Sequence, residues 1–168
     1  MTDNPFVAVV TLNYNGSSFL QECIDSILDS DYSNFKVIVV DNGSKDNSLE
    51  LLERLYGSND KVIVLKNNKN LGYSKGMNVG LDYGFNNLEA DFCLVMNNDT
   101  FLDKHAINAL VEVAQKDEKI GFVTGKVYYA DKPNIFQTIG KSSDPGLLCI
   151  IYTGKGEVDK GQYDRDCE

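Results

Sequence analysis

The stretch VIVVDNGSKDNSLELL, residues 37–52, contains a strand, a loop and the start of a helix. It opens on an unbroken apolar run rich in valine, which is typical of a strand covered on both faces. Apolar side chains recur at helical spacing over residues 51–56, and one of residues 46–48 is expected to cap that helix. The stretch therefore predicts a strand-loop-helix unit of an α/β protein.

The same unit recurs along the chain. Apolar runs predict strands at residues 6–10, 35–40, 61–65, 91–96 and 120–127. Helical spacing predicts one helix that begins near Ser17 or Ser18, one over residues 74–85, and one after Asp103. Because strands and helices alternate, we expect parallel βαβ units and a Rossmann-like, mostly parallel sheet flanked by helices.

The alternation weakens after residue 129. Short strands are expected at residues 135–139 and 147–152, and a polar, glycine-containing tail follows them. This tail has no clear core face. We therefore expect the fold to be incomplete at the C-terminus.

The composition excludes several classes of protein. The chain of 168 residues has 16 Lys and Arg against 25 Asp and Glu, a formal net charge of −9, which argues against nucleic acid as a partner. No apolar run approaches the roughly 18 residues that cross a bilayer, so no transmembrane segment is expected. No signal peptide is visible, and we expect a cytoplasmic protein. The four cysteines form no CxxC pair and His105 is the single histidine, which excludes a zinc module.

Polar residues follow each of the first four predicted strands. These loops are residues 13–16, 41–46, 67–73 and 97–100. In an open α/β sheet the carboxyl ends of the strands form the ligand-binding edge, so the four loops are expected to lie together there. Asn, Asp, Gly and Ser also form ordinary turns and helix caps, which is the simpler interpretation of any single loop. The four together supply more amide and carboxylate groups than turns need.

The chemistry of these loops suits a nucleotide. Asp41 can accept a hydrogen bond from a base or a ribose hydroxyl, and the neighbouring asparagines can both donate and accept. Residues 70–78 open a helix with two glycines and Lys75, where a diphosphate could lie at the helix N-terminus. Asp99 ends a strand and could bind a hard divalent cation that takes its other oxygens from substrate phosphates. Taken alone, Lys75 is more simply interpreted as a solvated lysine on a helix.

Motifs of other nucleotide-binding proteins are absent. The sequence has no GxGxxG after the first strand and no GxxxxGK[ST]. A receiver-like signalling domain needs adjacent carboxylates after the first strand, where Asn13-Tyr14-Asn15 stands instead. A nucleotidyltransferase needs a glycine-rich, arginine-containing loop there. Both alternatives are disfavoured.

Four blocks, in this order and spacing, resemble the inverting family 2 glycosyltransferases of the GT-A fold, especially their rhamnosyltransferase-like branch. The blocks are VAVVTLNYNGSSFLQECIDSIL (7–28), VIVVDNGSKDNSLELL (37–52), NLGYSKGMNVGL (70–81) and DFCLVMNNDTFLD (91–103). The resemblance implies transfer of a sugar, with inversion, from a nucleotide-diphospho-sugar such as dTDP-rhamnose or a UDP-sugar. The acceptor would be a hydroxyl of a glycan or lipid-linked saccharide. It also implies that the full-length protein lies in the cytoplasm, peripherally at the inner face of the membrane.

The resemblance also implies roles for individual residues. The nucleotide sugar would be held by Leu12, Asn13, Tyr14, Asn15, Asp41, Asn42, Ser44, Asn70, Gly72, Lys75, Asn78, Asn97 and Asn98. Residues 97–99 match the Asp-x-Asp motif of the family, with Asp99 as the ligand of Mg2+ or Mn2+. The first carboxylate of that motif is Asn97 here, which lowers the expected metal affinity.

The catalytic base is not assigned. Family members use a carboxylate, often in a Glu-Asp pair after the Asp-x-Asp block, and this chain has no Glu-Asp dipeptide. Asp144, Asp159, Asp164 and Asp166 lack the expected surroundings. We therefore expect a nucleotide-sugar-binding core over residues 1–130 and the start of a truncated acceptor-side region over residues 131–168. A non-catalytic nucleotide-sugar-binding module is the alternative, and the oligomeric state is left open.

Overall fold

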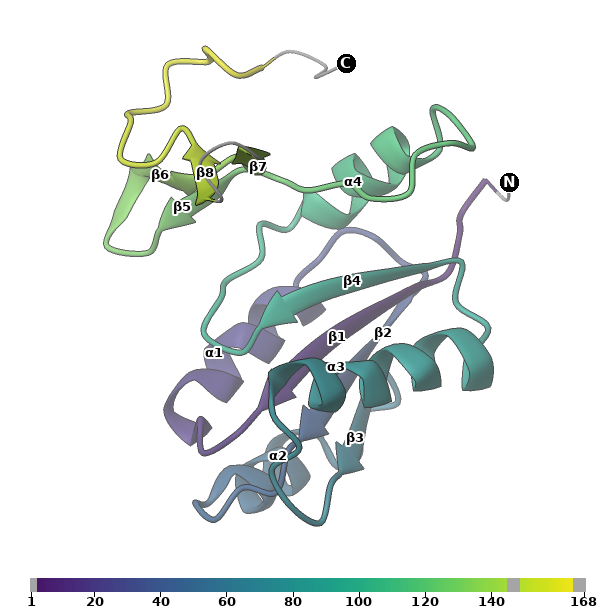
Figure 1. Cartoon of the computed structure of the whole chain (residues 1–168). Helices are drawn as coiled ribbons and strands as arrows, with labels where there is room; N and C mark the ends of the chain where they lie inside the picture. The colour runs from purple at the N-terminus through teal and green to yellow at the C-terminus, as the bar shows by residue number, and fades with distance from the viewer. Residues whose placement is uncertain (1–2, 145–148, 165–168) are drawn as a thin grey trace. The chain divides into compact units, whose positions relative to one another are not determined.

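The computed structural model describes residues 3–144 and 149–164. The chain forms two compact units, Met1–Val111 and Glu112–Glu168, each of which is described here by itself (Figure 1). The predicted division at residue 130, between a donor-binding core and an acceptor-side region, concerns function and stays a prediction.

The first unit is built on a parallel sheet of four strands. These are β1 (Val7–Asn13), β2 (Phe35–Asp41), β3 (Val62–Lys66) and β4 (Phe92–Asn97), in the order β3-β2-β1-β4. The central strands β1 and β2 are buried along almost their whole length, as their unbroken apolar runs predict. The four strands predicted for this part of the chain are thus confirmed.

Helices cover both faces of this sheet. On one face, α1 (Ser17–Leu28), α2 (Ser48–Tyr56) and the start of α4 (Ala106–Ala114) pack on β1 and β2 through Leu20, Ile24, Leu52 and Ile107. On the other face, α3 (Tyr73–Asp82) packs through Met77. Figure 1 shows α3 in front of the sheet with α1 and α2 behind it. The expected α/β layers are confirmed.

Glycines bring α3 close to the sheet. A Cβ on Gly80 would lie 2.4 Å from Cγ1 of Val10 and 2.8 Å from Cγ2 of Val40, so glycine is required for this approach. The helix predicted over residues 74–85 begins one residue earlier and changes at Tyr83 into a π-helical turn, η1 (Tyr83–Asn87). Gly84 in this turn lies against Ala8 and Cys93, so the wider turn continues the close packing.

The second unit consists of two antiparallel strand pairs. β5 (Val127–Tyr129) pairs with β6 (Lys132–Thr138), and β7 (Gly140–Asp144) pairs with β8 (Cys149–Thr153). The strands expected at 135–139 and 147–152 lie within or overlap β6 and β8, although residues 147 and 148 fall outside the described residues.

The strand predicted at residues 120–127 is wrong, because only Val127 of that run is in a strand. Phe122 is fully exposed, and nothing lies within 4 Å of a Cβ built on Gly121 or Gly125. Glycine weakens a strand, and an apolar side chain without a packing surface cannot hold one in place.

A charged and aromatic cluster joins the tail of the second unit to its β5–β6 pair. The Lys126 ammonium contacts the carboxylates of Asp159, at 3.0 Å, and of Asp164, and Tyr128 donates a hydrogen bond to Asp159. The hydrogen bonds that Asp159 accepts from Tyr128, from the backbone N–H of Gly161 and from Lys126 lower its pKa to about 2. The buried Phe136 ring lies between those of Tyr128 and Tyr163. No helix in the described part of the chain is long and apolar enough to cross a membrane.

Candidate functional site

The strand register brings three loops to one edge of the sheet. Asn13 at the end of β1 is paired with Asp41 at the end of β2, and Leu12 is paired with Asn97 at the end of β4. The loop before α3 reaches the same edge, because Asn67 donates its backbone N–H to the carbonyl oxygen of Asp41 at 2.8 Å. The carboxyl ends of the parallel strands therefore meet, as the sequence predicts.

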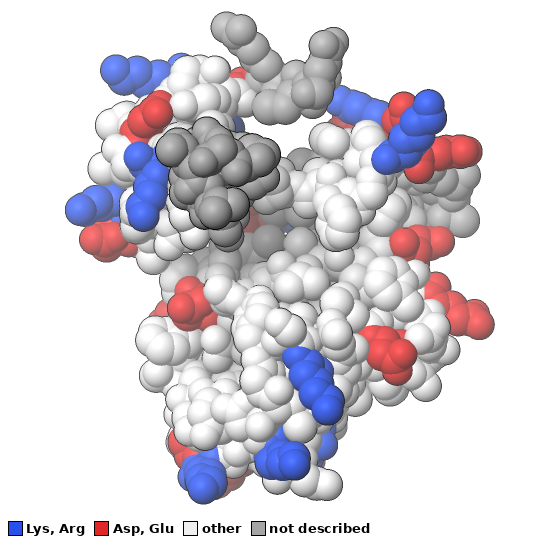
Figure 2. Space-filling view, viewed as in Figure 1, with Lys and Arg blue, Asp and Glu red and all other residues white. Residues whose placement is uncertain are grey.

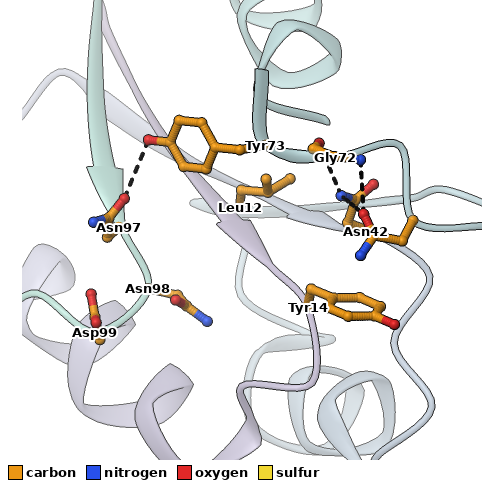
Figure 3. A pocket seen from close by; sticks show the side chains of 9 residues that line it. Leu12, Tyr14, Asn42, Gly72, Tyr73, Asn97, Asn98 and Asp99 are labelled. Atoms are coloured by element: carbon orange, nitrogen blue, oxygen red, sulfur yellow. Dashed lines mark hydrogen bonds between the residues drawn. The ribbon is translucent and has the colours of Figure 1, made fainter. Parts of the chain in front are cut away.

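An open pocket of about 420 Å³ lies at this edge, entirely within the first unit (Figure 3). It is lined by Leu12, Tyr14, Asn42, Asn70, Gly72, Tyr73, Asn97, Asn98 and Asp99. All of these except Tyr73 were predicted from the sequence as ligands of a nucleotide sugar or a metal. The structure thus brings these eight predicted residues together, and their contact with a ligand stays a prediction.

Tyr73 is the pocket residue that the sequence reasoning did not single out. It is the first residue of α3 and 56% exposed, and its hydroxyl donates a hydrogen bond of 3.2 Å to Oδ1 of Asn97. Figure 3 shows its ring extending from α3 across Leu12 toward the end of β4. An aromatic residue directly after Gly72, in a loop that is mostly polar, was the available signal.

Asn42 is buried under the loop that leads into α3. Its nitrogen donates to Oδ1 of Asn70 at 3.0 Å and to the carbonyl oxygen of Gly72 at 3.2 Å. Its oxygen accepts from the side chain of Asn67 at 3.1 Å and from the backbone N–H of Leu71 at 3.0 Å. One side chain therefore holds residues 67–72 against the end of β2, and its contact with a nucleotide sugar stays a prediction.

The conformation of Gly72 sets the start of α3. Its φ of 79° and ψ of 171° lie in a region that glycine adopts readily, and nothing lies within 4 Å of a Cβ built on it. The N–H groups of the first helical turn are left without intrahelical partners. An anion could approach them closely at Gly72, which agrees with the predicted place of a diphosphate.

Two predicted ligands, Asn13 and Asp41, lie behind the pocket and are completely buried. Asp41 accepts hydrogen bonds through Oδ2 from the side chain of Asn13, at 2.9 Å, and through Oδ1 from the backbone N–H groups of Gly43 and Ser44. Asn13 in turn accepts one from the side chain of Asn98, at 2.9 Å. Both carboxylate oxygens of Asp41 therefore already have hydrogen-bond partners within the protein. Direct contact of Asn13 or Asp41 with a nucleoside stays a prediction.

Four other predicted ligands do not line the pocket. Ser44 is half-buried, and its hydroxyl accepts hydrogen bonds from the side chain of Asn13 and the backbone N–H of Asn15. Asn15 is exposed with φ of 53°, and its side chain accepts from the backbone N–H of Lys45 at 2.7 Å. Both residues shape the loop around the pocket. Lys75 and Asn78 are exposed on α3, and their contact with a diphosphate stays a prediction.

Asp99 is the carboxylate of the pocket. It is exposed, and no group of three or more His, Cys, Asp or Glu suited to a metal ion occurs in the described residues. A cation here would have Asp99 and neighbouring amide oxygens, and would take its remaining ligands from water or a substrate. This donor set fits Mg2+ or Mn2+ only together with a ligand that carries oxygens of its own.

Two further ionisable side chains of the first unit have no place in the pocket. Burial raises the pKa of the Cys23 thiol to about 11, and this thiol donates to the carbonyl oxygen of Asn97 at 3.6 Å. The His105 ring contacts the carboxylate of Asp31, and both side chains are exposed. The hydrogen bond from His105 is the main cause that lowers the pKa of Asp31. His105 thus joins α4 to the segment after α1.

Charged side chains are scattered over the face of the first unit that carries β4 and α3. Figure 2 shows broad uncharged areas there, with isolated groups of both signs. An anionic ligand in the pocket would therefore depend on backbone N–H groups, amides and a cation rather than on a broad basic surface.

Comparison with known proteins assigns the family. Residues 8–158 match the family described as glycosyl transferase family 2. The chain belongs to this family.

Curated relatives of this family 2 chain include bacterial enzymes. Poly-beta-1,6-N-acetyl-D-glucosamine synthase from Staphylococcus aureus (strain COL) is 28% identical over 148 residues, 86% of this chain and 35% of the synthase. An uncharacterized glycosyltransferase from Haemophilus influenzae is 33% identical over 81 residues, 48% of this chain and 25% of that protein. The chain spans about a third of the length of the synthase.

Solved structures of similar fold are glycosyltransferases. Mannosyltransferase PcManGT from Pyrobaculum calidifontis, in complex with GDP-Man and Mn2+, has a TM-score of 0.62 at 19% identity, over 68% of this chain and 34% of that chain. S. aureus TarS 1–349 has a TM-score of 0.60 at 22% identity, over 83% of this chain and 41% of that chain. TarS has also been solved with UDP-GlcNAc. These likenesses show that the family 2 chain has the GT-A fold.

Proposed function

We propose that this chain supplies the donor-binding part of an inverting glycosyltransferase that acts in the cytoplasm. The donor is a nucleotide-diphospho-sugar, and the acceptor is a hydroxyl of a saccharide or a lipid-linked saccharide. The observation that carries the proposal is the pocket at the ends of β1 and β4 and the start of α3, where eight predicted ligands meet. Family membership supports the same class of reaction.

The identity of the donor is inferred from the relatives. The S. aureus synthase is named for N-acetylglucosamine, and TarS has been solved with UDP-GlcNAc. These names favour a UDP-sugar over dTDP-rhamnose, the donor of the rhamnosyltransferase-like branch. PcManGT has been solved in complex with GDP-Man. The binding experiment therefore includes a guanine nucleotide for comparison.

In this proposal, different pocket residues bind different parts of the donor. The exposed ring of Tyr14 and the Leu12 side chain offer an apolar surface for the nucleoside, while Asn70 and Gly72 place the diphosphate at the start of α3. Asn97 and Asn98 supply amide groups at the opposite wall, beside Asp99. Each group acts by binding and orienting the donor, which is how a preorganised site lowers the barrier to transfer.

Mg2+ or Mn2+ bound at Asp99 would offset negative charge on the departing diphosphate. The exposed Asp99 carboxylate and an amide oxygen fit such an ion when the donor supplies phosphate oxygens. The complex of PcManGT with Mn2+ and GDP-Man agrees with this requirement for a metal.

A nucleotide-sugar-binding module without transfer is the second candidate. The observation in its favour is that the described candidate bases are engaged elsewhere: Asp159 and Asp164 both contact Lys126. The side chains of Asp144 and Asp166 lie outside the described residues. A base that takes the acceptor proton is thus not assigned in this chain.

Calorimetry on the 168-residue chain tests the proposal. UDP, UDP-GlcNAc, GDP-mannose and dTDP-rhamnose would each be titrated with Mn2+ and again with EDTA. We expect saturable binding of at least one of these nucleoside diphosphates or nucleotide-diphospho-sugars, and we expect this binding to be stronger with Mn2+ than with EDTA. Absence of binding by all four ligands under both conditions would contradict the proposal. Incubation of the chain with labelled donor and saccharide acceptors then separates the two candidates, because the binding module predicts binding without transfer.

A further inference from the structure

A buried chain of polar side chains runs behind the pocket and joins the ends of three strands. Asp41 ends β2, Asn13 ends β1, and Asn98 follows the last residue of β4. The side-chain nitrogen of Asn13 lies 2.9 Å from Oδ2 of Asp41, and the side-chain nitrogen of Asn98 lies 2.9 Å from Oδ1 of Asn13. Asp41 and Asn13 are completely buried, whereas Asn98 is half-buried and lines the pocket.

The direction of these hydrogen bonds is fixed by Asp41. Both carboxylate oxygens of Asp41 accept hydrogen bonds, so the amide of Asn13 turns its nitrogen toward Asp41. Its oxygen then faces Asn98, which must present its own nitrogen in return. The Asn98 amide therefore cannot rotate by half a turn without placing two oxygens against each other, and its oxygen is left for the pocket.

We propose that Asp41 is a positioning residue that acts through Asn13 to hold the amide oxygen of Asn98 toward the pocket, where it accepts a hydrogen bond from the ligand. This inference rests on the proposed binding of a nucleotide sugar. It gives Asp41 a role different from the nucleoside contact that the family resemblance implies. The carboxylate orients a neighbouring group and does not itself touch the ligand.

The partners of Asp41 support this role. Oδ1 accepts from the backbone N–H groups of Ser44, at 2.9 Å, and Gly43, at 3.2 Å, and Oδ2 accepts from Asn13. Asp41 exposes 0% of its surface, so a ligand could reach the carboxylate only after neighbouring groups moved away. Buried polar groups that are fully paired hold one arrangement, because any change leaves a donor or acceptor unsatisfied.

Gly16 leaves the space that the last of these hydrogen bonds needs. It precedes α1 with φ of −113°, which any residue can adopt. A Cβ at this position would lie 2.2 Å from Nδ2 of Asn98 and 2.6 Å from Oδ1 of Asn13. Alanine would therefore push the Asn98 side chain aside while leaving every hydrogen-bonding group in the protein unchanged.

Reversing the direction of the hydrogen bonds between residues 41, 13 and 98 tests the proposal. In D41N the new amide must keep its oxygen toward Gly43 and Ser44, so its nitrogen faces Asn13, and Asn13 and Asn98 both turn over. Asn98 then presents nitrogen to the pocket. We expect the affinity for UDP, measured by calorimetry, to fall about tenfold, the effect of losing one good hydrogen bond. D60N, which changes an exposed carboxylate after α2 in the same way, is the matched control and should leave the affinity for UDP unchanged.

The exchanged pair D41N/N13D restores the original direction. Asn at position 41 donates to Asp at position 13, which accepts from Asn98, so the Asn98 oxygen again faces the pocket. We expect affinity within about twofold of wild type, well inside the tenfold loss of the single variant. If UDP contacts Asp41 directly, the pair will bind as weakly as D41N, and this result overturns the proposal.

Two measurements keep the test decisive if the exchanged pair does not fold. G16A should lower the affinity for UDP about tenfold, with G121A as a control where no atom lies near the new methyl group. In free wild type, NMR should show slower hydrogen exchange for the Asn98 side-chain amide than for that of the exposed Asn78. Unchanged affinity in G16A, or equally fast exchange at the two amides, overturns the proposal. Absence of UDP binding by the wild type would instead contradict the proposed function, and the exchange measurement would still test the positioning.

Discussion

The hydroxyl of Tyr73 lies 3.2 Å from Oδ1 of Asn97 and donates a hydrogen bond to it. This contact joins the first residue of α3 to the last residue of β4, and both residues line the pocket. The sequence predicts that Asn97 stands at the position of the first carboxylate of the Asp-x-Asp motif. Tyr73 contacts this residue.

N97D should strengthen metal-dependent nucleotide binding. An aspartate at this position keeps the hydrogen bond from Tyr73, now to a charged acceptor, and places a second carboxylate near Asp99. We expect the affinity for UDP in the presence of Mn2+ to rise about tenfold, with little change in EDTA. Calorimetry under both conditions measures the difference. N87D, at the exposed last residue of η1, controls for the added charge, and an equal rise in both variants would contradict the prediction.

D99A should remove the part of nucleotide binding that depends on metal. Asp99 is the carboxylate that lines the pocket, and the described residues contain no cluster of ligands that could replace it. We expect the affinity for UDP in D99A to be the same with Mn2+ and with EDTA, and to match that of wild type in EDTA. D60A serves as the control. A wild-type response to Mn2+ that persists in D99A would assign the ion to other residues.

Much of the fold and of the pocket could be predicted from the sequence. The apolar runs of β1 and β2 are nearly continuous because both faces are covered, so their ends, and the polar loops after them, were visible as changes in composition. Parallel pairing then requires those ends to lie together. This is why Asn42, Asn70 and Asp99 could be grouped although they are far apart in the chain.

Other features depend on packing that a sequence pattern does not record. The apolar residues at 120–127 resemble a strand, but no surface lies against Phe122, which is fully exposed. The burial of Asp41 was equally hidden, because a carboxylate at a strand end suits either a ligand contact or an internal hydrogen bond. Only the positions of Asn13 and Ser44 show that its oxygens are already in use.

G80A should destabilise the first unit. The added methyl group would lie 2.4 Å from Val10 and 2.8 Å from Val40, both completely buried in the central strands. Relief requires α3 to move away from the sheet, and overpacking of this kind costs about 1–3 kcal/mol. Urea unfolding followed by circular dichroism should show a lower midpoint. G125A, which meets no atom within 4 Å, is the control, and a G80A midpoint as high as that of G125A would contradict the packing argument.

Two thiols should make the first unit less stable at high pH. Burial raises the pKa of Cys23 and of Cys93 from 9.0 to about 11. Between these values the unfolded chain loses thiol protons that the folded chain keeps, so the free energy of unfolding falls as the pH rises. We expect the urea midpoint to drop from pH 8 to pH 10 by a larger amount in wild type than in C23A/C93A. Because the tyrosines and lysines contribute equally in both proteins, identical drops would show that the thiols are not responsible.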